Sequence, residues 1–99
     1  MKTTIFPYEL HVSGCGFCVV LELSEDNALA LPLTALVCAR LAGREDAQRL
    51  ILEFPGHQVT IEGGGLRDMV THLLAGRVKT LRVGRHEDCA VTRIHAAEK

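Results

Sequence analysis

Two short motifs contain the residues of this chain that are best suited to chemistry. Cys15 and Cys18 form a C-x-x-C pair, a spacing that lets two thiolates bind one tetrahedral metal ion or form a reversible disulfide. His86 and Cys89 form an H-x-x-C pair with the same two-residue gap. Together the two pairs supply a Cys3His ligand set for structural zinc, provided that the fold brings them together.

An ordinary structural role explains the same cysteines without a metal. Cys18 and Cys38 lie in apolar stretches, where cysteine serves as a small hydrophobic residue, and Cys15 and Cys89 are then incidental thiols. A second C-x-x-C would indicate zinc more strongly than the H-x-x-C pair does. We therefore keep zinc as the alternative and expect a chain without a cofactor.

The sequence does not give these cysteines the neighbouring features that catalytic cysteines need. A thioredoxin-like motif places its first cysteine at the start of a helix, whose dipole lowers the thiol pKa, but here Cys18 is followed by the strand-like pattern VVLEL at residues 19–23. A cysteine nucleophile also needs a histidine within hydrogen-bond reach, and the sequence places none of its five histidines beside a particular thiol. We therefore assign no catalytic residue and expect that the chain is not an enzyme.

Three consecutive glycines, Gly63 to Gly65, precede a predicted helix and raise the question of phosphate binding. A glycine loop that opens onto the N–H groups of a helix can hold phosphate. The chain lacks the spaced glycines of a dinucleotide-binding loop and the Gly-Lys-Ser/Thr ending of a P-loop. We interpret the three glycines as a strand-to-helix connection.

The densest basic cluster comprises Arg77, Lys79, Arg82 and Arg85 and suggests contact with nucleic acid. The formal net charge of −1 gives the chain no field that would attract nucleic acid or anionic lipid. With one tyrosine, three phenylalanines and no tryptophan, the chain also has few aromatic side chains on which bases can stack. We interpret the cluster as the solvated charges of an edge strand and expect no nucleic-acid partner.

The elements that position these residues follow from the spacing of apolar side chains between His57 and Gly84. The spacing has period two at first, becomes helical, and returns to period two, which predicts strand, helix and strand. We expect the helix over about residues 66–76, with Gly65 at its N-cap and Gly76 just beyond its end. Its apolar stripe consists of Leu66, Met69, Val70, Leu73 and Leu74.

The rest of the chain predicts further strands, and two segments stay open. Residues 33–42 form either a single turn followed by a strand from Val37 to Leu41, which we favour, or a helix from Thr34 to Ala42. Residues 85–99 are a frayed tail or a short last strand. The predicted fold is a single α+β domain: a mainly antiparallel sheet of five or six strands, curved or barrel-like, with one amphipathic helix near the C-terminus.

The apolar content predicts self-association. Hydrophobic residues make up 47% of the 99 residues, which is high for a domain with so small an interior. Ile5, Val20 and Ile51 lie on strand faces opposite the main apolar rows, and one helix cannot cover a whole sheet. We therefore expect a homodimer or a higher oligomer, in which a second copy covers this surface.

The sequence also indicates a cellular location. Its longest apolar run, residues 28–37, is far shorter than the roughly 20 residues that a membrane span needs. Polar residues and Pro7 interrupt the apolar stretch that a secretory signal requires. We expect a cytoplasmic protein with reduced cysteines and no membrane contact.

Two function hypotheses follow. The leading one is a non-enzymatic cytoplasmic interaction or regulatory module that self-associates and has room for a protein partner. The alternative is a small domain stabilised by zinc at Cys15, Cys18, His86 and Cys89, contacting nucleic acid through its basic C-terminal strand. The residues give no ligand, partner or pathway for either.

Overall fold

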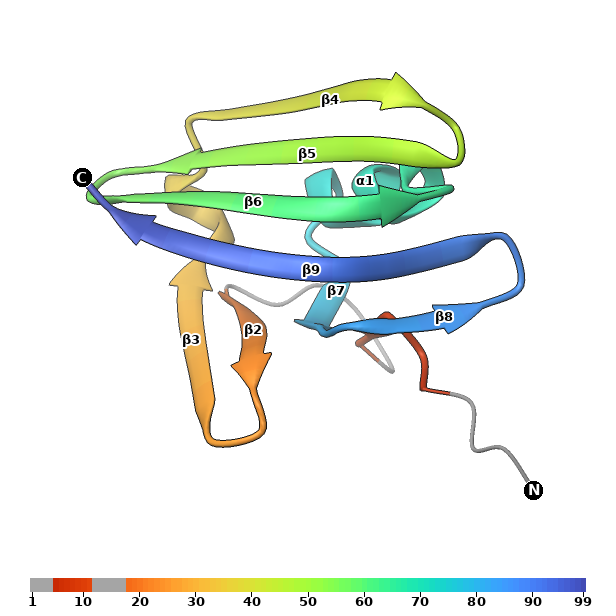
Figure 1. Cartoon of the computed structure of the whole chain (residues 1–99). Coiled ribbons are helices and arrows are strands. Elements are labelled where there is room, and N and C mark those ends of the chain that lie inside the picture. The colour runs from red at the N-terminus through yellow and green to blue at the C-terminus, as the bar shows by residue number, and fades with distance from the viewer. Residues whose placement is uncertain (1–4, 12–17) are drawn as a thin grey trace.

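The computed structural model describes residues 5–11 and 18–99 and divides their strands between two sheets (Figure 1). The smaller sheet has the order β1-β7-β2-β3 and comprises β1 (Tyr8–Leu10), β2 (Cys18–Ser24), β3 (Asn27–Pro32) and β7 (Val78–Leu81). The larger sheet has the order β4-β5-β6-β9-β8 and comprises β4 (Cys38–Arg44), β5 (Ala47–Phe54), β6 (His57–Gly64), β8 (Gly84–His86) and β9 (Cys89–Glu98). The helical segments are η1 (Leu33–Ala35) and α1 (Arg67–Leu74).

The α+β class agrees with the sequence prediction, but the single barrel-like sheet of five or six strands is wrong. The strand pairs are antiparallel except for β2 with β7, and the two sheets are not closed into a barrel. The chain crosses between the sheets three times: at η1, after Pro32 ends β3; through α1, between β6 and β7; and at residues 82–83. The third crossing divides the expected basic strand over residues 77–85 into β7 and β8, which belong to different sheets.

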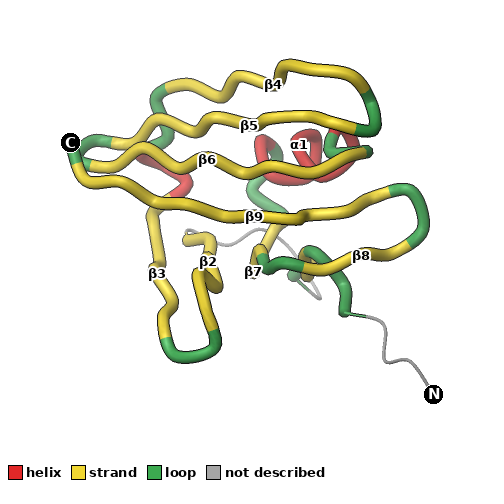
Figure 2. Tube along the Cα trace, viewed as in Figure 1, coloured by secondary structure: helices red, strands yellow, loops and turns green. Residues whose placement is uncertain are grey.

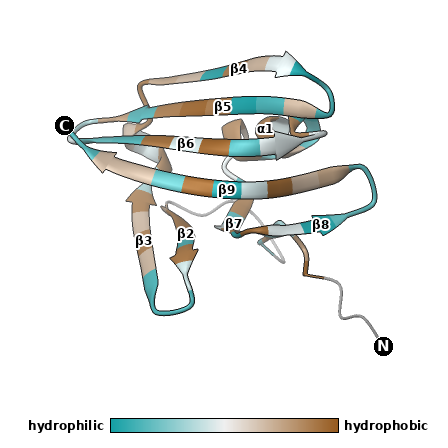
Figure 3. Ribbon diagram, in the orientation of Figure 1, coloured by the Kyte–Doolittle hydropathy of each residue, from teal (hydrophilic) through white to brown (hydrophobic). Residues whose placement is uncertain are grey.

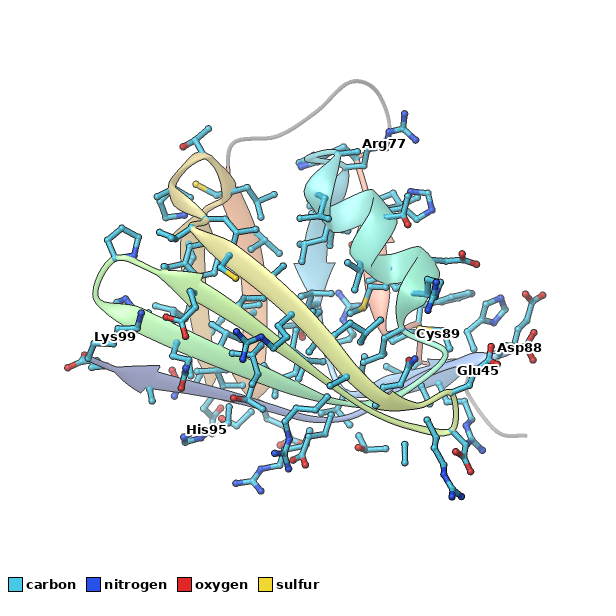
Figure 4. All side chains as sticks on the ribbon, turned by 90° about the horizontal axis from the view of Figure 1, so that it is seen from above. Glu45, Arg77, Asp88, Cys89, His95 and Lys99 are labelled. Atoms are coloured by element: carbon cyan, nitrogen blue, oxygen red, sulfur yellow. The ribbon has the colours of Figure 1, made fainter. Side chains whose placement is uncertain are left out.

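The core lies between the larger sheet and the elements behind it. The helix α1 and the smaller sheet occupy the same side of the larger sheet (Figures 1 and 4). Apolar and polar residues alternate along β5, β6 and β9 (Figure 3), so one face of these strands turns toward the core. The fully buried part of the core includes Val19, Leu21, Leu50, Leu52, Phe54, Val59, Ile61, Val78 and Leu81.

The apolar stripe of α1 is narrower than its sequence suggests. Leu66, Met69 and Leu73 are buried in the core, and Val70 is partly buried. Leu74, expected in the same stripe, is 61% exposed. The helix therefore contacts the core through about one residue per turn, and of its apolar residues only the last, Leu74, lies mostly in solvent.

The ends of α1 confirm one predicted cap and correct the other. Gly76 has a φ of +73° directly after the C-cap Ala75, as predicted for a residue that ends a helix in the left-handed region. The N-cap is Leu66 rather than Gly65, and no side chain of its own caps it. Instead the amide side chain of Gln48 on β5 is buried, and its Oε1 accepts a hydrogen bond of 2.7 Å from the Leu66 N–H.

The two open segments are now assigned. Residues 33–42 follow the favoured alternative, because the short turn η1 leads into the strand β4 (Figure 2). Residues 85–99 form β8 and the ten-residue β9, which lies between β6 and β8. A β-bulge opposite Glu62 and Gly63 adds a residue between Val91 and Arg93, so that Val91 and Ile94, three positions apart, both reach the core. This irregularity hides β9 from a search for strict alternation.

The N-terminal segment connects the two sheets. The Pro7 carbonyl accepts a hydrogen bond of 2.8 Å from the Arg82 N–H, and the Ile5 carbonyl accepts one of 2.9 Å from the Arg85 N–H at the edge of β8. Elsewhere among the described residues, β3 and β4 are the longest strands with a neighbour on one side only. The helical segments of the described chain fall short of the length and apolar character that crossing a membrane requires.

Adjacent residues of α1 provide a test of this packing. Leu73→Asp should lower the free energy of unfolding by about 4 kcal/mol or more, because it buries an unpaired carboxylate in the core. Leu74→Asp should change it by less than about 1 kcal/mol, because Leu74 is mostly in solvent. Urea denaturation followed by circular dichroism measures both, and equal losses in the two variants would contradict the placement of α1.

Candidate functional site

A cleft of about 300 Å³ lies where the N-terminal segment, the start of α1 and the β8–β9 turn meet. Phe6 and Tyr8 line one part of it, and the carboxylates of Asp68, Glu87 and Asp88 line another. Aromatic faces combined with carboxylates suit a cationic group better than an anion. This combination makes the cleft the candidate functional site of the described chain.

Two of the predicted site residues, His86 and Cys89, line this cleft. They are register partners across the two-residue turn Glu87-Asp88, so their side chains extend from the same face of the β8–β9 hairpin. Glu87 has a φ of +52°, the left-handed value that tight hairpin turns require at their first central residue. The H-x-x-C spacing therefore corresponds to a real juxtaposition, although it comes from a hairpin turn.

The thiol of Cys89 is held in its neutral form. Burial raises the pKa of Cys89, and the nearby negative charge of Asp68 raises it further. Burial likewise raises the pKa of the Tyr8 phenol, with additional contributions from Cys89 and Asp68. A neutral thiol is a poor nucleophile, so the cleft is suited to binding rather than to covalent catalysis.

The imidazole of His86 contacts an aromatic ring and a carboxylate. Its ring centroid lies 4.3 Å from that of Phe6, with the two planes tilted by 49°. Its Nε2 lies 3.8 Å from Oε1 of Glu87, a distance at which a protonated ring forms an ion pair. These contacts orient the ring at the mouth of the cleft.

The structure does not bring Cys18 to this cleft. Cys18 is an exposed thiol at the start of β2, and this end of β2 lies apart from the β8–β9 turn in both views (Figures 1 and 4). Cys15 lies outside the described residues. Within residues 5–11 and 18–99, no group of three or more His, Cys, Asp or Glu side chains is placed to hold a metal ion. The Cys3His set therefore stays a prediction.

The three glycines predicted as a connection serve close packing. A Cβ on Gly63 would lie 1.9 Å from the Ala90 carbonyl oxygen, and one on Gly65 would lie 1.8 Å from that of Asp88. Gly65 also has a φ of +61°. Only glycine lets the β8–β9 hairpin approach the end of β6 this closely, and the approach forms one wall of the cleft.

A larger, open groove of about 1090 Å³ lies at the same end of the larger sheet. It is lined by the β4–β5 turn, the end of β6 and the β8–β9 turn, and Figure 4 shows Glu45 and Asp88 near each other there. Both basic and acidic residues line it, including Arg49, Arg85 and Glu62. Its mixed charge favours neither phosphate nor a metal ion.

Arg82, expected as part of a basic cluster, holds the smaller sheet together. Its Nη2 lies 2.9 Å from carboxylate oxygens of both Glu9 and Glu22, and its Nε donates a hydrogen bond of 3.1 Å to Glu22. Burial alone would lower the pKa of Arg82, but the hydrogen bonds to Glu9 and Glu22 outweigh burial and raise it. Arg82 therefore links β1 and β2 at the end of β7, and its charge is neutralised.

The side of the larger sheet that faces away from α1, the outer face, is charged. Arg49 and Arg93 flank Glu62 at 3.5 Å and 3.7 Å, and Glu53 binds Lys99 and accepts a hydrogen bond of 2.6 Å from Gln58. These contacts lower the pKa of Glu53, mainly through the hydrogen bond from Lys99.

The bare apolar face that the sequence predicted is therefore absent from the described residues. Val20 and Ile51 are partly buried, and of the three residues expected on that face only Ile5, at 54%, is largely exposed. Self-association needs another structural basis.

Comparisons of this chain with known protein families, with curated proteins and with solved structures found no match.

Alkylation kinetics test the electrostatics of the cleft. Iodoacetamide at mildly alkaline pH should modify the exposed Cys38 faster than Cys89, because the raised pKa and the burial of Cys89 leave little accessible thiolate. Asp68→Asn should accelerate the reaction of Cys89, since removing the negative charge lowers the pKa of that thiol. Mass spectrometry of each cysteine peptide follows the rates, and Cys38 serves as the internal standard. An unchanged Cys89 rate in the variant would contradict the contact.

Proposed function

We propose that this chain is a small, non-enzymatic, cytoplasmic interaction module that pairs with a second copy of itself along β3. The observation that carries the proposal is the free edge of β3, which among the described strands is bonded to β2 alone. Such an edge exposes unpaired backbone N–H and C=O groups that can pair with another chain. In the cytoplasm, the exposed thiols of Cys18 and Cys38 would stay reduced.

The residues of β3 support pairing between copies. The strand reads NALALP and has no charged side chain, and charge is one of the devices that prevent such pairing at natural edge strands. Its proline, Pro32, stands at the last position of the strand. Ala28 and Ala30 are exposed, and Leu31 is buried against the core. An antiparallel pair of copies centred on Leu29 places Ala28 of one copy opposite Ala30 of the other, with no steric or charge conflict.

The neutral cleft is consistent with a module that binds rather than catalyses. The raised pKa values of Cys89 and Tyr8 keep both groups uncharged near neutral pH. A nucleophile at neutral pH requires the opposite shift or an adjacent base. The cleft remains available to a partner while β3 is occupied by a second copy, since β3 does not line it.

Sedimentation equilibrium tests the proposed pairing. The protein should be dimeric at micromolar concentration, and Ala28→Lys/Ala30→Lys should weaken the dimer by about a hundredfold or more, because lysines of the two copies then face each other. Ala28→Ser/Ala30→Ser, without charge, should remain dimeric. Ala42→Lys, at an exposed position on β4, should also leave the dimer intact. A monomeric wild-type protein, or a dimer that survives the two lysines, would refute pairing at β3.

A zinc-stabilised domain is the second candidate, and the pairing of His86 with Cys89 across one turn favours it. In this candidate Cys15 and Cys18 complete the site, and nucleic acid contacts the exposed Arg77, Lys79 and Arg85.

Metal analysis tests the zinc candidate. It predicts about one zinc ion per chain in protein purified without chelator. Cys89→Ser should abolish the zinc content, because it removes one of the four proposed ligands, whereas Cys38→Ser should retain it. Elemental analysis of both variants gives the answer, and zinc-free wild-type protein would eliminate this candidate.

A further inference from the structure

The strand β4 is the other long free edge of the described chain. It pairs with β5 from Cys38↔Glu53 to Arg44↔Ala47, and no element of residues 5–11 and 18–99 lies beyond it (Figures 1 and 4). In an edge strand, every second residue directs its backbone N–H and C=O away from the neighbouring strand. The edge of β4 is therefore as open to strand addition as that of β3.

The side chains of β4 distinguish it from β3. Arg40 and Arg44 are both exposed and, being four residues apart on a strand, extend from the same outer face. In an antiparallel pair of copies centred on Ala42, Arg40 of one copy would lie opposite Arg44 of the other. Like charges in that position are destabilising, so β4 disfavours a second copy and favours an acidic strand.

The inner side of the same edge is apolar. Val37, directly before β4, is 73% exposed, the highest value among the exposed large hydrophobic residues. Val37, Ala39 and Leu41 alternate with the outer residues, and Ala39 and Leu41 pack against the core. An added strand would cover Val37 and the remaining surface of Leu41 with its own apolar face.

The charges around the edge set the position of the acids in the added strand. Glu53, opposite Cys38, is already engaged by Lys99 and Gln58, and Arg49 is paired with Glu62. Glu45 and Asp46 follow β4 in the turn and would repel acids placed beyond Arg44. Carboxylates are thus favoured opposite Arg40 and Arg44, and not further along.

We propose that β4 binds an extended acidic segment of another protein by strand addition. The segment has acidic residues four positions apart, opposite Arg40 and Arg44, and apolar residues on its other face, against Val37 and Leu41. Backbone hydrogen bonds to the free edge provide affinity, and the two arginines provide selectivity. The proposal is independent of pairing at β3, which involves the other sheet.

A protein segment fits this edge better than nucleic acid does. The free N–H and C=O groups of β4 are complementary to a peptide backbone, whereas a phosphate chain has no donor for the carbonyls. The described strand positions of the outer face carry no phenylalanine, tyrosine or tryptophan on which a base could stack.

A synthetic peptide tests the proposal. The probe is a fluorescent seven-residue peptide with valines on one face and, on the other, two glutamates four positions apart. Fluorescence anisotropy should show saturable binding to the wild-type protein and to the Ala28→Lys/Ala30→Lys variant, so that failure here and failure of the β3 dimer are separate results. Arg40→Glu/Arg44→Glu should weaken binding by about tenfold or more and should favour the same peptide with lysines in place of its glutamates.

Two controls separate strand addition from general attraction of charge. Arg77→Glu/Lys79→Glu changes the net charge by the same amount at exposed positions away from β4 and should leave binding unchanged. Methylation of alternate backbone amides on the edge that faces β4 should abolish binding. Full binding by the methylated peptide, an equal effect of the two charge reversals, or displacement of the peptide by oligothymidine at similar affinity would each overturn the proposal.

Discussion

Burial of the inner face of the larger sheet is the constraint on which the rest of this structure depends. Leu50, Leu52, Phe54, Val59 and Ile61 form a continuous apolar surface on two adjacent strands, and each fully buried side chain of this kind contributes about 1.5 to 3 kcal/mol. Neither α1 nor the smaller sheet covers this surface alone, so both lie on the same side of it. The outer face then remains in water, where charged pairs such as Arg49 with Glu62 replace apolar contacts.

The cleft is a consequence of how tightly the same elements pack. Gly63 and Gly65 let the β8–β9 hairpin approach the end of β6, and the buried Gln48 amide fixes the start of α1 beside it. The space left between these elements and the N-terminal segment is partly shielded from water, so burial and the charge of Asp68 together keep Cys89 neutral. The spacing of His86 and Cys89 suggested a pair of metal ligands, whereas the protonation state of Cys89 is set by the residues around it.

Elements with regular apolar periodicity can be predicted from the sequence. Features that depend on contacts between distant parts of the chain cannot. The helical spacing and Gly76 locate α1, and alternation locates β5 and β6. Each of these elements buries a single face, so its apolar residues recur at the period of its secondary structure. The exposure of Leu74, the bulge in β9 and the capping of α1 by Gln48 depend on neighbours distant in sequence. For the same reason the spacing of His86 and Cys89 predicts their juxtaposition across a turn, whereas the separation between that pair and Cys18 follows from the division into two sheets.

The backbone hydrogen bonds that Arg85 and Arg82 donate to the carbonyls of Ile5 and Pro7 have a consequence for folding during synthesis. The earliest described residues can complete these bonds only after residues 82 and 85 have been synthesised. Contacts this distant in sequence close slowly, since the entropy of a long loop must be lost before they form. Slow closure of these contacts prolongs the partly folded state, in which the uncharged edge of β3 can pair with other partly folded chains.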